Sequence, residues 1–541
     1  MYVILWVAFL TFHGGLSGLT NAQEQETPIT CQITLRGLPQ FSSNKGLDPG
    51  TLVPYELVRS FSISCVGEGT PIELEAHRNV IQAAESVEGV TLIPSKVENG
   101  FLTFRDIEGV TLKDSMFDNL IGGGLAPLML VNSGVQLVNC TFNGNSLARA
   151  GAMHISSSVV VMHRSKMYGN TGLSYGAIGA VEGSKLSLTD CVVEGNVGGT
   201  QMDVLGGFVS GGIFSFKNTI LKIKNTLFDR NLALGSGGGA VTSVNKCIVN
   251  ITNSQFEDHE GGSGAVGLFQ FSSANIVGSD FVSNRANDDG AALTLRINSM
   301  ATLVDTKFQA NSGSSGAILA RGDSELSITG GRFFMNEGTA YSGAVSVFGG
   351  TDTKISSTTF EGNMGLNGGS VYGEKASSTT IKGSKFMKNV GLRFGGAVYQ
   401  SNCDSTTIGS CVFSGNTADI AGGAVMQVGC EYNKNDGETD GVFKKCEIPE
   451  LVRCNSVMIK GSKFEDNSSE GWGSDIFQKG CMDVQVMSSK FLSKSEPALE
   501  GTVYQEKCSA QSMEENIFKA GAKNIKPKGT VISKDCPSEG I

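Results

Sequence analysis

Two short motifs that recur together along the chain constrain its fold more than any other feature. Phe413-Ser414-Gly415-Asn416 is followed by Gly422-Gly423-Ala424-Val425, and the same pair of motifs begins at Phe228 and at Phe386. Successive copies lie about 25 to 28 residues apart, a period typical of a solenoid or another repeat architecture. The residues in the leading position are Phe142, Met167, Val193, Phe228, Phe256, Phe281, Phe308, Phe333, Phe360, Phe386, Phe413, Phe464 and Phe491.

Apolar residues alternate with others in the stretch after each Gly-Gly-Ala motif, as Leu293, Leu295 and Ile297 do. Alternation predicts a strand with one buried face, and Gly or Asn marks each corner between strands. A coil of about 25 to 28 residues with three such strands predicts an all-β fold, the right-handed parallel β-helix, because crossovers between parallel strands favour that hand.

Stacked coils bring like side chains to about 4.8 Å from one another, so the recurring Phe residues should form a buried column. The Asn three residues after each Phe should form a ladder of amide hydrogen bonds at a corner of the coil. The predicted corner ladder contains Asn145, Asn231, Asn284, Asn311, Asn336, Asn363, Asn389, Asn416 and Asn467.

The N-terminal part of the chain lacks the repeat. Residues 1–22 are predicted to be a secretory signal peptide, because the segment from Tyr2 to Phe12 is almost entirely apolar and small residues precede a cleavage site after Ala22. Residues 23–88 are predicted to form a cap with the first strands. Within that cap, apolar residues at helical spacing predict a short helix from Glu73 to Glu88.

The β-helix itself is predicted over residues 89–518, with an inserted polar loop at 431–453 and a C-terminal cap or tail at 519–541. The net charge of −10 comes with no basic block, which argues against a nucleic-acid partner. No segment after the signal peptide is long and apolar enough to be a transmembrane helix. These features predict a secreted or cell-surface protein.

The pairing of Phe-x-x-Asn with Gly-Gly-Ala-(Ile/Val) resembles the repeats of the polymorphic outer-membrane proteins of chlamydiae. Similar repeats occur in secreted right-handed β-helix proteins of the pectin-lyase-like group. The resemblance covers roughly residues 115 to 510. It implies a β-helix that is exposed at a cell surface, with an adhesive role transferred by analogy of fold.

Thirteen cysteines in a secreted chain indicate disulfide bonds. Cys31 and Cys65 lie in two predicted strands that a bridge would join. In one corner column, Cys403–Cys430 with Cys454–Cys481 is one possible pairing, and Cys430–Cys454 with Cys481–Cys508 is the other. The disulfide candidates are Cys31, Cys65, Cys403, Cys430, Cys446, Cys454, Cys481 and Cys508.

Three other cysteines, Cys140, Cys191 and Cys411, stand two residues before the Phe position, in a slot for small inward side chains. We expect them to be buried thiols. Of the sequons at Asn139, Asn250 and Asn467, Asn250 is the best glycosylation candidate, because Asn467 belongs to the predicted ladder.

An enzyme of this fold would need acidic residues on one face of neighbouring coils, since glycoside hydrolysis uses two carboxylates. The strongest cluster is Asp229, Glu257 and Asp258 with His259. We expect Arg230 to neutralise Asp258 and His259 to fill an Asn slot, so the cluster is a weak catalytic candidate.

Other charged features also have a structural interpretation. Asp288-Asp289 is predicted to be a turn, and the segment from Asn433 to Gly441 fails as a calcium loop because Gly437 stands at a ligand position. We predict no metal site and no cofactor. Basic residues precede the Phe and acidic ones follow it, which favours a solvated face of alternating charge over a stripe for acidic glycans. The basic residues are Lys307, Arg332, Lys385, Lys463 and Lys490.

Two functions therefore remain open. The sequence favours a non-enzymatic structural or adhesive β-helix protein with a glycan, cell-surface or matrix partner. The alternative is a polysaccharide lyase or glycoside hydrolase of the pectin-lyase-like group that acts on acidic glycans.

Overall fold

The computed structural model describes residues 111–121, 125–199, 207–429, 456–481, 483–492, 502–505 and 515–517 in full, together with Phe104, and only the backbone of residues 110, 122, 493, 506 and 518–520. It also gives the backbone of the strands β1 (Thr30–Arg36), β2 (Pro54–Tyr55), β3 (Ser60–Val66), β4 (Ile72–Glu75), β5 (Asn79–Ala83), β6 (Val90–Leu92), β7 (Ser95–Glu98), β8 (Leu102–Arg105), β64 (Gln511–Ser512) and β66 (Val531–Lys534). Every regular element among these residues is a β-strand.

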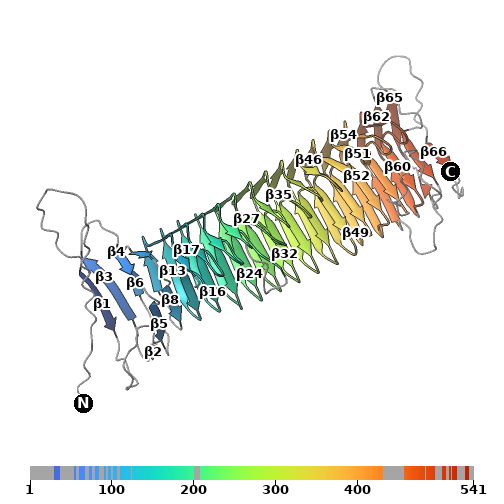
Figure 1. Cartoon of the computed structure of the whole chain (residues 1–541). Helices are drawn as coiled ribbons and strands as arrows, with labels where there is room; N and C mark the ends of the chain where they lie inside the picture. Colours follow the sequence, from blue (N-terminus) through green and yellow to red (C-terminus); the bar gives the residue numbers. More distant parts are fainter. Residues whose placement is uncertain are drawn as a thin grey trace, which may run out of the picture. The chain divides into compact units, whose positions relative to one another are not determined.

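The chain forms two units, and each is a parallel β-helix (Figure 1). The first unit contains Met1–Gly207 and Gly211–Leu227, and the second contains Phe208–Ser210 and Phe228–Ile541. Each turn adds one strand to each of several parallel sheets, in register with the strand of the preceding turn.

A turn of the second unit shows the pattern. It consists of β33 (Ser273–Val277), β34 (Asp280–Val282), β35 (Arg285–Ala286) and β36 (Leu293–Arg296). We call the sheets that these four strands enter sheets 1, 2, 3 and 4. Three strands per coil were predicted, and the fourth is the two-residue strand of sheet 3, which lies just after the corner Asn and is too short to show alternation.

The first unit repeats this order. One of its turns contains β13 (Gly134–Val138), β14 (Thr141–Asn143), β15 (Ser146–Leu147) and β16 (Met153–Ser156). The strands pair in parallel with those of the next turn, as β13 does with β17 (Val159–His163).

Sheet 2 carries the predicted Phe column. In the second unit the rings from Phe228 to Phe491 stack on one another with centroids 4.5–5.1 Å apart and nearly parallel planes. In the first unit Phe117 stacks on Phe142 at 4.5 Å, and Met167 and Val193 continue as buried residues. This spacing follows from the separation of paired strands, which is about 4.8 Å.

The helix predicted from Glu73 to Glu88 is wrong, because β4 and β5 occupy that segment. β4 pairs in parallel with β7, and β5 pairs in parallel with β8. In so short a segment the apolar spacing fits the period of a helix as well as that of a strand. Pairing with the strands of the following turn shows that the segment is β. Ahead of them β1 pairs antiparallel with β3, and Cys31 is the register partner of Cys65.

Candidate functional site

The predicted corner ladder lies inside each unit. The side-chain Nδ2 of one Asn donates to Oδ1 of the Asn one turn further on, at 2.8–3.0 Å. In the first unit it also includes Asn170 and Asn196, which the sequence analysis missed although each stands three residues after a residue of the Phe column. In the second unit the ladder ends at Asn467, whose Nδ2 donates to Oδ1 of the buried Asp475 at 2.9 Å. These amides are structural, since each is buried and hydrogen-bonded.

The weak catalytic candidates have different surroundings in the structure. His259 is buried in the ladder, where its Nδ1 accepts a hydrogen bond from the backbone N–H of Asn231 at 3.0 Å. Burial lowers the pKa of His259 to about 3, so the imidazole is neutral. Arg230 pairs with Asp229 at 2.9 Å and not with Asp258 as expected.

Glu257 is the remaining acid of that cluster. Burial raises the pKa of its carboxyl, and the neighbouring charges of Asp229, Asp258 and Asp280 raise it further. Burial and like charges together supply this shift, and on the next turn the register partner of Glu257 is the apolar Val282.

The cysteines are resolved in part. Cys140, Cys191 and Cys411 are buried free thiols. Burial raises the pKa of both Cys140 and Cys411 to about 11. Cys403 and Cys481 are buried, and their thiols donate to Gln400 Oε1 at 3.0 Å and to Lys479 O at 3.6 Å. The side chains of Cys31, Cys65, Cys430, Cys446, Cys454 and Cys508 lie outside the described residues, so the pairings stay predictions.

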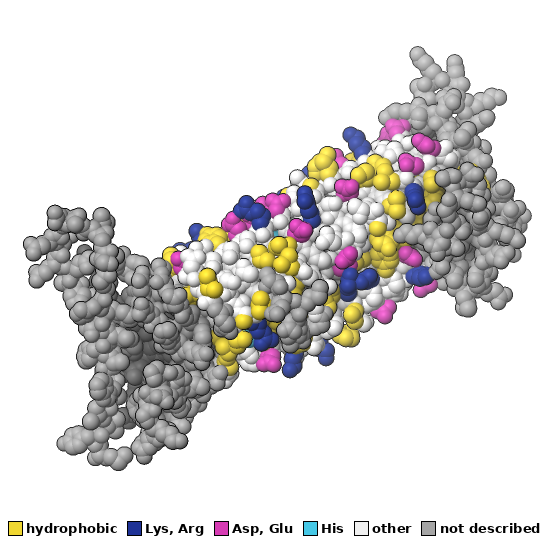
Figure 2. Space-filling model, in the orientation of Figure 1, with side chains coloured by type: hydrophobic (Ala, Val, Ile, Leu, Met, Phe, Trp, Pro, Cys, Tyr) yellow, Lys and Arg dark blue, Asp and Glu magenta, His cyan; other side chains and the backbone are white. Residues whose placement is uncertain are grey.

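The basic column of sheet 2 is largely neutralised by its own neighbours. Lys307 pairs with Asp280 at 3.3 Å, Arg332 with Glu361 at 3.1 Å, and Lys463 with Glu465 at 2.7 Å. Basic and acidic side chains are interspersed on the face of the molecule in Figure 2. This arrangement fits a solvated face better than a stripe for acidic ligands.

The three sequons differ in accessibility. Asn250 is half-buried in β29 (Ile248–Thr252). Asn139 donates to Asp114 Oδ1 at 2.7 Å, and Asn467 is buried in the ladder.

Aromatic and charged side chains of the kind that bind ligands lie instead on the outer face of sheet 4 in the second unit. The first and third residues of each strand face the core, so the second and fourth lie on the opposite face. The strands are β28 (Val241–Val244), β32 (Val266–Phe269), β36, β40 (Ile318–Arg321), β44 (Val345–Phe348), β48 (Val371–Glu374), β52 (Val398–Ser401), β56 (Val425–Val428), β60 (Ile476–Lys479) and β63 (Val503–Glu506).

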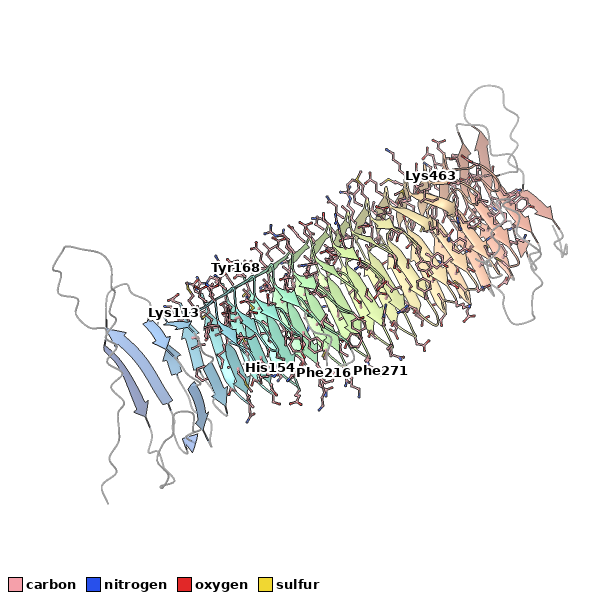
Figure 3. All side chains as sticks on the ribbon, in the orientation of Figure 1. Lys113, His154, Tyr168, Phe216, Phe271 and Lys463 are labelled. Atoms are coloured by element: carbon pink, nitrogen blue, oxygen red, sulfur yellow. The ribbon has the colours of Figure 1, made fainter. Side chains whose placement is uncertain are left out.

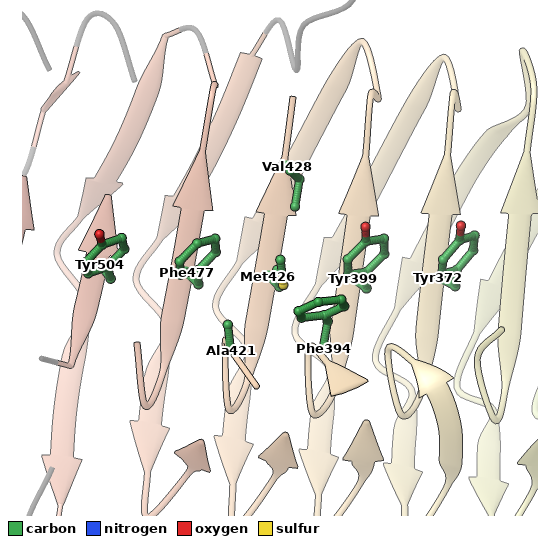
Figure 4. Close-up of a cluster of buried hydrophobic side chains, with 8 residues drawn as sticks. All are labelled: Tyr372, Phe394, Tyr399, Ala421, Met426, Val428, Phe477 and Tyr504. Carbon is green, nitrogen blue, oxygen red and sulfur yellow. The ribbon is translucent and has the colours of Figure 1, made fainter. Parts of the chain in front are cut away.

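Towards the C-terminal turns this face is aromatic. Tyr372, Tyr399, Met426, Phe477 and Tyr504 take the second position of successive strands (Figure 4). The rings of Tyr372 and Tyr399 stack at 5.3 Å, and those of Phe477 and Tyr504 stack at 5.2 Å. We call these five residues the aromatic row.

Loops that precede sheet 4 cover the aromatic row. Phe394, Ala421 and Trp472 stack turn on turn through isolated parallel bridges and pack against the row. The row is therefore a second apolar core outside the coil, which the sequence analysis missed because these loops have no motif of their own.

Earlier turns of the same face carry charge. Arg296 and Arg321 end β36 and β40 and are register partners, and we call them the arginine pair. Asp289, from the loop before β36, pairs with Arg296 and accepts a hydrogen bond from Ser263 Oγ at 3.0 Å. The Asp289 side chain is only 2% exposed. The predicted turn at Asp288-Asp289 therefore holds a buried counter-ion.

Arg321 differs from Arg296 in its surroundings. It is exposed, and among the described residues it has no ion pair. Burial and the adjacent Arg296 both lower the pKa of Arg321, while Asp289 and Tyr341 oppose that effect. The loop before β40 holds the small residues Ser314 and Ser315, whereas the loop before β44 supplies Tyr341, which is close enough to act on the charge of Arg321.

Tyr341 and Phe348 connect the arginine pair to the aromatic row. Phe348 is the register partner of Arg321, and the Tyr341 ring packs edge-on against it with centroids 4.7 Å apart. The Tyr341 ring also lies 5.1 Å from that of Tyr372, whose hydroxyl donates to Glu374 Oε2 at 2.7 Å.

The corner after sheet 4 is strained beside the arginine pair. Phe271 has φ 63° and Ile297 has φ 60°, a left-handed conformation that bulky L-residues rarely adopt. Both side chains are exposed, at 57% and 47%, and Phe271 is labelled in Figure 3. The Ile297 N–H donates to the carbonyl of Arg321 at 3.3 Å. The same corner is left-handed in other turns, as at Lys246 and Asp323, so this conformation belongs to the geometry of the coil, and only the bulky side chains are particular to these two turns.

The described residues offer neither a metal-binding cluster nor a membrane-spanning helix. No group of three or more His, Cys, Asp or Glu side chains there is arranged to hold a metal ion. No helix in those ranges is long and apolar enough to cross a membrane.

Comparison with known proteins agrees with the fold. The family model described as "Right handed beta helix region" matches residues 102–286. The chain is a β-helix repeat protein, of the right-handed parallel class.

Two individual proteins are similar to it. Metabotropic glutamate receptor-like protein R of Dictyostelium discoideum is 35% identical over 188 residues, which is 33% of this chain and 11% of that protein. The chain thus matches only a small part of this relative. A mannuronic acid-specific family 6 polysaccharide lyase from the human gut microbiota aligns over 75% of this chain and 81% of its own, at 11% identity and a TM-score of 0.30. Neither likeness assigns an activity to this chain.

Proposed function

We propose that this chain is a non-enzymatic β-helix protein of the cell exterior that binds a glycan or matrix partner through the outer face of sheet 4. The observation that carries the proposal is the arginine pair beside Tyr341 and Phe348. Binding sites combine apolar and aromatic surface with a few charged groups that fix orientation, and this face has both. On sheet 2, by contrast, most charges pair with each other.

The adhesive part of the proposal is supported by the repeats, which resemble those of chlamydial surface proteins. Export is supported by the apolar segment from Tyr2 to Phe12. Comparing secretion of the chain with and without residues 1–22 tests export, and retention of both forms inside the cell would contradict it.

Binding is tested with the purified chain lacking residues 1–22, on a glycan array and on cell-surface and matrix preparations. We expect saturable binding that weakens when Tyr341 is replaced by Ala and persists in a Lys385→Ala control on sheet 2. Absence of binding to every glycan, cell and matrix sample would refute the proposal.

A polysaccharide lyase or glycoside hydrolase is the alternative, and the raised pKa of Glu257 is the observation in its favour. The same protein is incubated with acidic and neutral polysaccharides, with and without calcium, while reducing ends and unsaturated products are followed. We expect no product. Product that is lost in Glu257→Gln would establish the enzyme instead.

A further inference from the structure

Sheet 1 of the first unit carries lysines on its outer face. The first, third and fifth residues of its strands are the more exposed ones, as in β21 (Lys185–Thr189) and β25 (Ile220–Lys224). Exposed lysines occupy three of these positions and the corner just before β25. We call these four residues the lysine face: Lys185, Lys217, Lys222 and Lys224.

The coil does not need cations in these positions. Three successive strands of sheet 1 in the second unit, β29, β33 and β37 (Met300–Val304), have no charged residue at all. On β25, by contrast, Lys222 and Lys224 project from the same face of one strand, about 7 Å apart at the backbone, and repel each other. Like charges that oppose stability and serve no packing role are expected on a binding surface.

The protein does not neutralise the lysine face. None of its four lysines forms an ion pair with a described residue. Two acids lie beside it: Glu182 accepts a hydrogen bond from Ser156 Oγ at 3.1 Å, and Asp190 accepts one from Asn225 Nδ2 at 3.1 Å. The exposed Arg164, which follows β17, adds a fifth cation to the same side of the sheet. The face therefore keeps a positive charge, although the whole chain carries −10.

Apolar residues lie between the cations. Lys185 has Val159 of β17 as its register partner on one side and Ile220 of β25 on the other. Val159 is 48% exposed, and Ile220 is half-buried. The strands β17, β21 and β25 hold no Phe, Tyr or Trp on which a base or a sugar ring could stack. A sheet face that mixes lysines with aliphatic side chains fits the surface of an anionic bilayer, where cations meet phosphates and aliphatic groups enter the interface.

We propose that the lysine face binds the anionic headgroups of a phospholipid bilayer and that Val159 and Ile220 contact the bilayer interface. This inference goes beyond the proposed function, because it concerns the first unit and not the outer face of sheet 4. The attraction acts within a Debye length of the headgroups and falls as salt is added. The net charge of −10 by itself predicts repulsion from such a bilayer, so binding must depend on this face.

The experiment measures cosedimentation of the purified chain with vesicles of phosphatidylcholine and phosphatidylglycerol in equal parts, and with vesicles of phosphatidylcholine alone. We expect binding to the anionic vesicles at about 0.05 M salt and its loss at about 0.5 M salt. The triple variant Lys185→Gln, Lys222→Gln and Lys224→Gln should bind about a hundredfold more weakly, because each lysine near an anionic surface contributes about fivefold. The corresponding triple replacement by Arg keeps the charges and should bind like the wild type.

The matched control replaces three exposed lysines on sheet 1 of the second unit, which stand on separate strands: Lys354→Gln, Lys382→Gln and Lys460→Gln. It changes the net charge of the chain by the same amount and should alter vesicle binding less than about threefold. Equal losses in the two glutamine triples would overturn the lysine face in favour of attraction to lysines in general.

Three other results would also overturn the proposal. They are the absence of binding to anionic vesicles at low salt, equal binding to neutral vesicles, and binding of inorganic polyphosphate without binding of vesicles, which would assign the face to a soluble polyanion. The two proposals are separable, because Tyr341→Ala should leave vesicle binding unchanged. Loss of vesicle binding in the lysine triple, in turn, should leave binding of a glycan or matrix partner at sheet 4 intact.

Discussion

Replacing His259 by Asn should make the second unit more stable in acid. His259 interrupts the corner ladder between Asn231 and Asn284, and its Nε2 is buried with no hydrogen-bond partner among the described atoms. An Asn at position 259 can accept from the Asn231 N–H and donate to Asn284 Oδ1, as the ladder does at other turns. One restored hydrogen bond contributes about 1 kcal/mol at neutral pH.

The larger effect comes from protonation. Burial lowers the pKa of His259 from 6.5 to about 3, so between these values the unfolded chain binds a proton that the folded chain does not. Stability is therefore complete above pH 6.5 and is lost as the pH falls towards 3. The loss amounts to roughly 2 kcal/mol at pH 5 and approaches roughly 5 kcal/mol below pH 3. The His259→Asn variant has no such loss of stability, because Asn does not bind a proton in this range.

Hydrogen exchange measured by mass spectrometry is the suitable assay, because solenoids can unfold turn by turn. Peptides that cover residues 228–262 are compared between variant and wild type at pH 7.5 and at pH 5. We expect the protection gained by His259→Asn to grow by roughly 2 kcal/mol at the lower pH. His163→Asn, a half-buried position of sheet 1 in the first unit, is the control. An equal gain at both pH values would refute the reasoning.

Three further outcomes follow from buried groups. Asp475 is the opposite case, because burial raises its pKa from 3.8 to about 7, and stability should therefore fall as the pH rises between these values. In urea unfolding, Asp475→Asn should remove up to about 4 kcal/mol of that loss, and a parallel pH dependence in both proteins would contradict this. Asn336→Ala removes hydrogen bonds to Asn311, Asn363 and Phe308 O, so it should lower the free energy of unfolding by about 3–5 kcal/mol in the same assay. A loss below about 1 kcal/mol would show that the ladder is not stabilising. Cys411→Ser should leave the free energy of unfolding nearly unchanged, because Ser384 and Ser462 fill the same position on the adjacent turns. The wild-type thiol, with its pKa raised to about 11, should resist alkylation until the chain unfolds, and rapid labelling of native Cys411 would contradict its burial.

The interior could be predicted from the sequence because the same side chain recurs in every turn. Phe256, Phe281 and Phe308 stack because their strands are in register, so one motif fixes a whole column. The Asn ladder follows from the same register. Asn170 and Asn196 belong to it although their turns lack Phe, which shows that position in the coil matters more than the motif.

The outer face could not be predicted in this way. Arg296 and Arg321 are 25 residues apart and belong to no motif, so only the register of β36 and β40 makes them neighbours. Asp289 was taken for a turn because the loops of adjacent turns hold Gly and Ser there. Its role depends on where the loop lies over the sheet, which periodicity does not encode. The sheet-2 charges were predictable because they alternate in phase with Phe.

Stacking in register also explains why the arginine pair is a candidate for functional tests. Inside the coil, like side chains stabilise one another, as the aligned rings and amides show. On the outer face the same alignment brings Arg321 against Arg296, and like charges in register destabilise a sheet. Asp289 offsets one of them and leaves the other facing solvent beside Tyr341. Cations are also in register on sheet 2, at Lys307 with Arg332, but there each of the two has its own acid. Arg321 lacks one among the described residues, which is expected where a ligand supplies the missing negative charge.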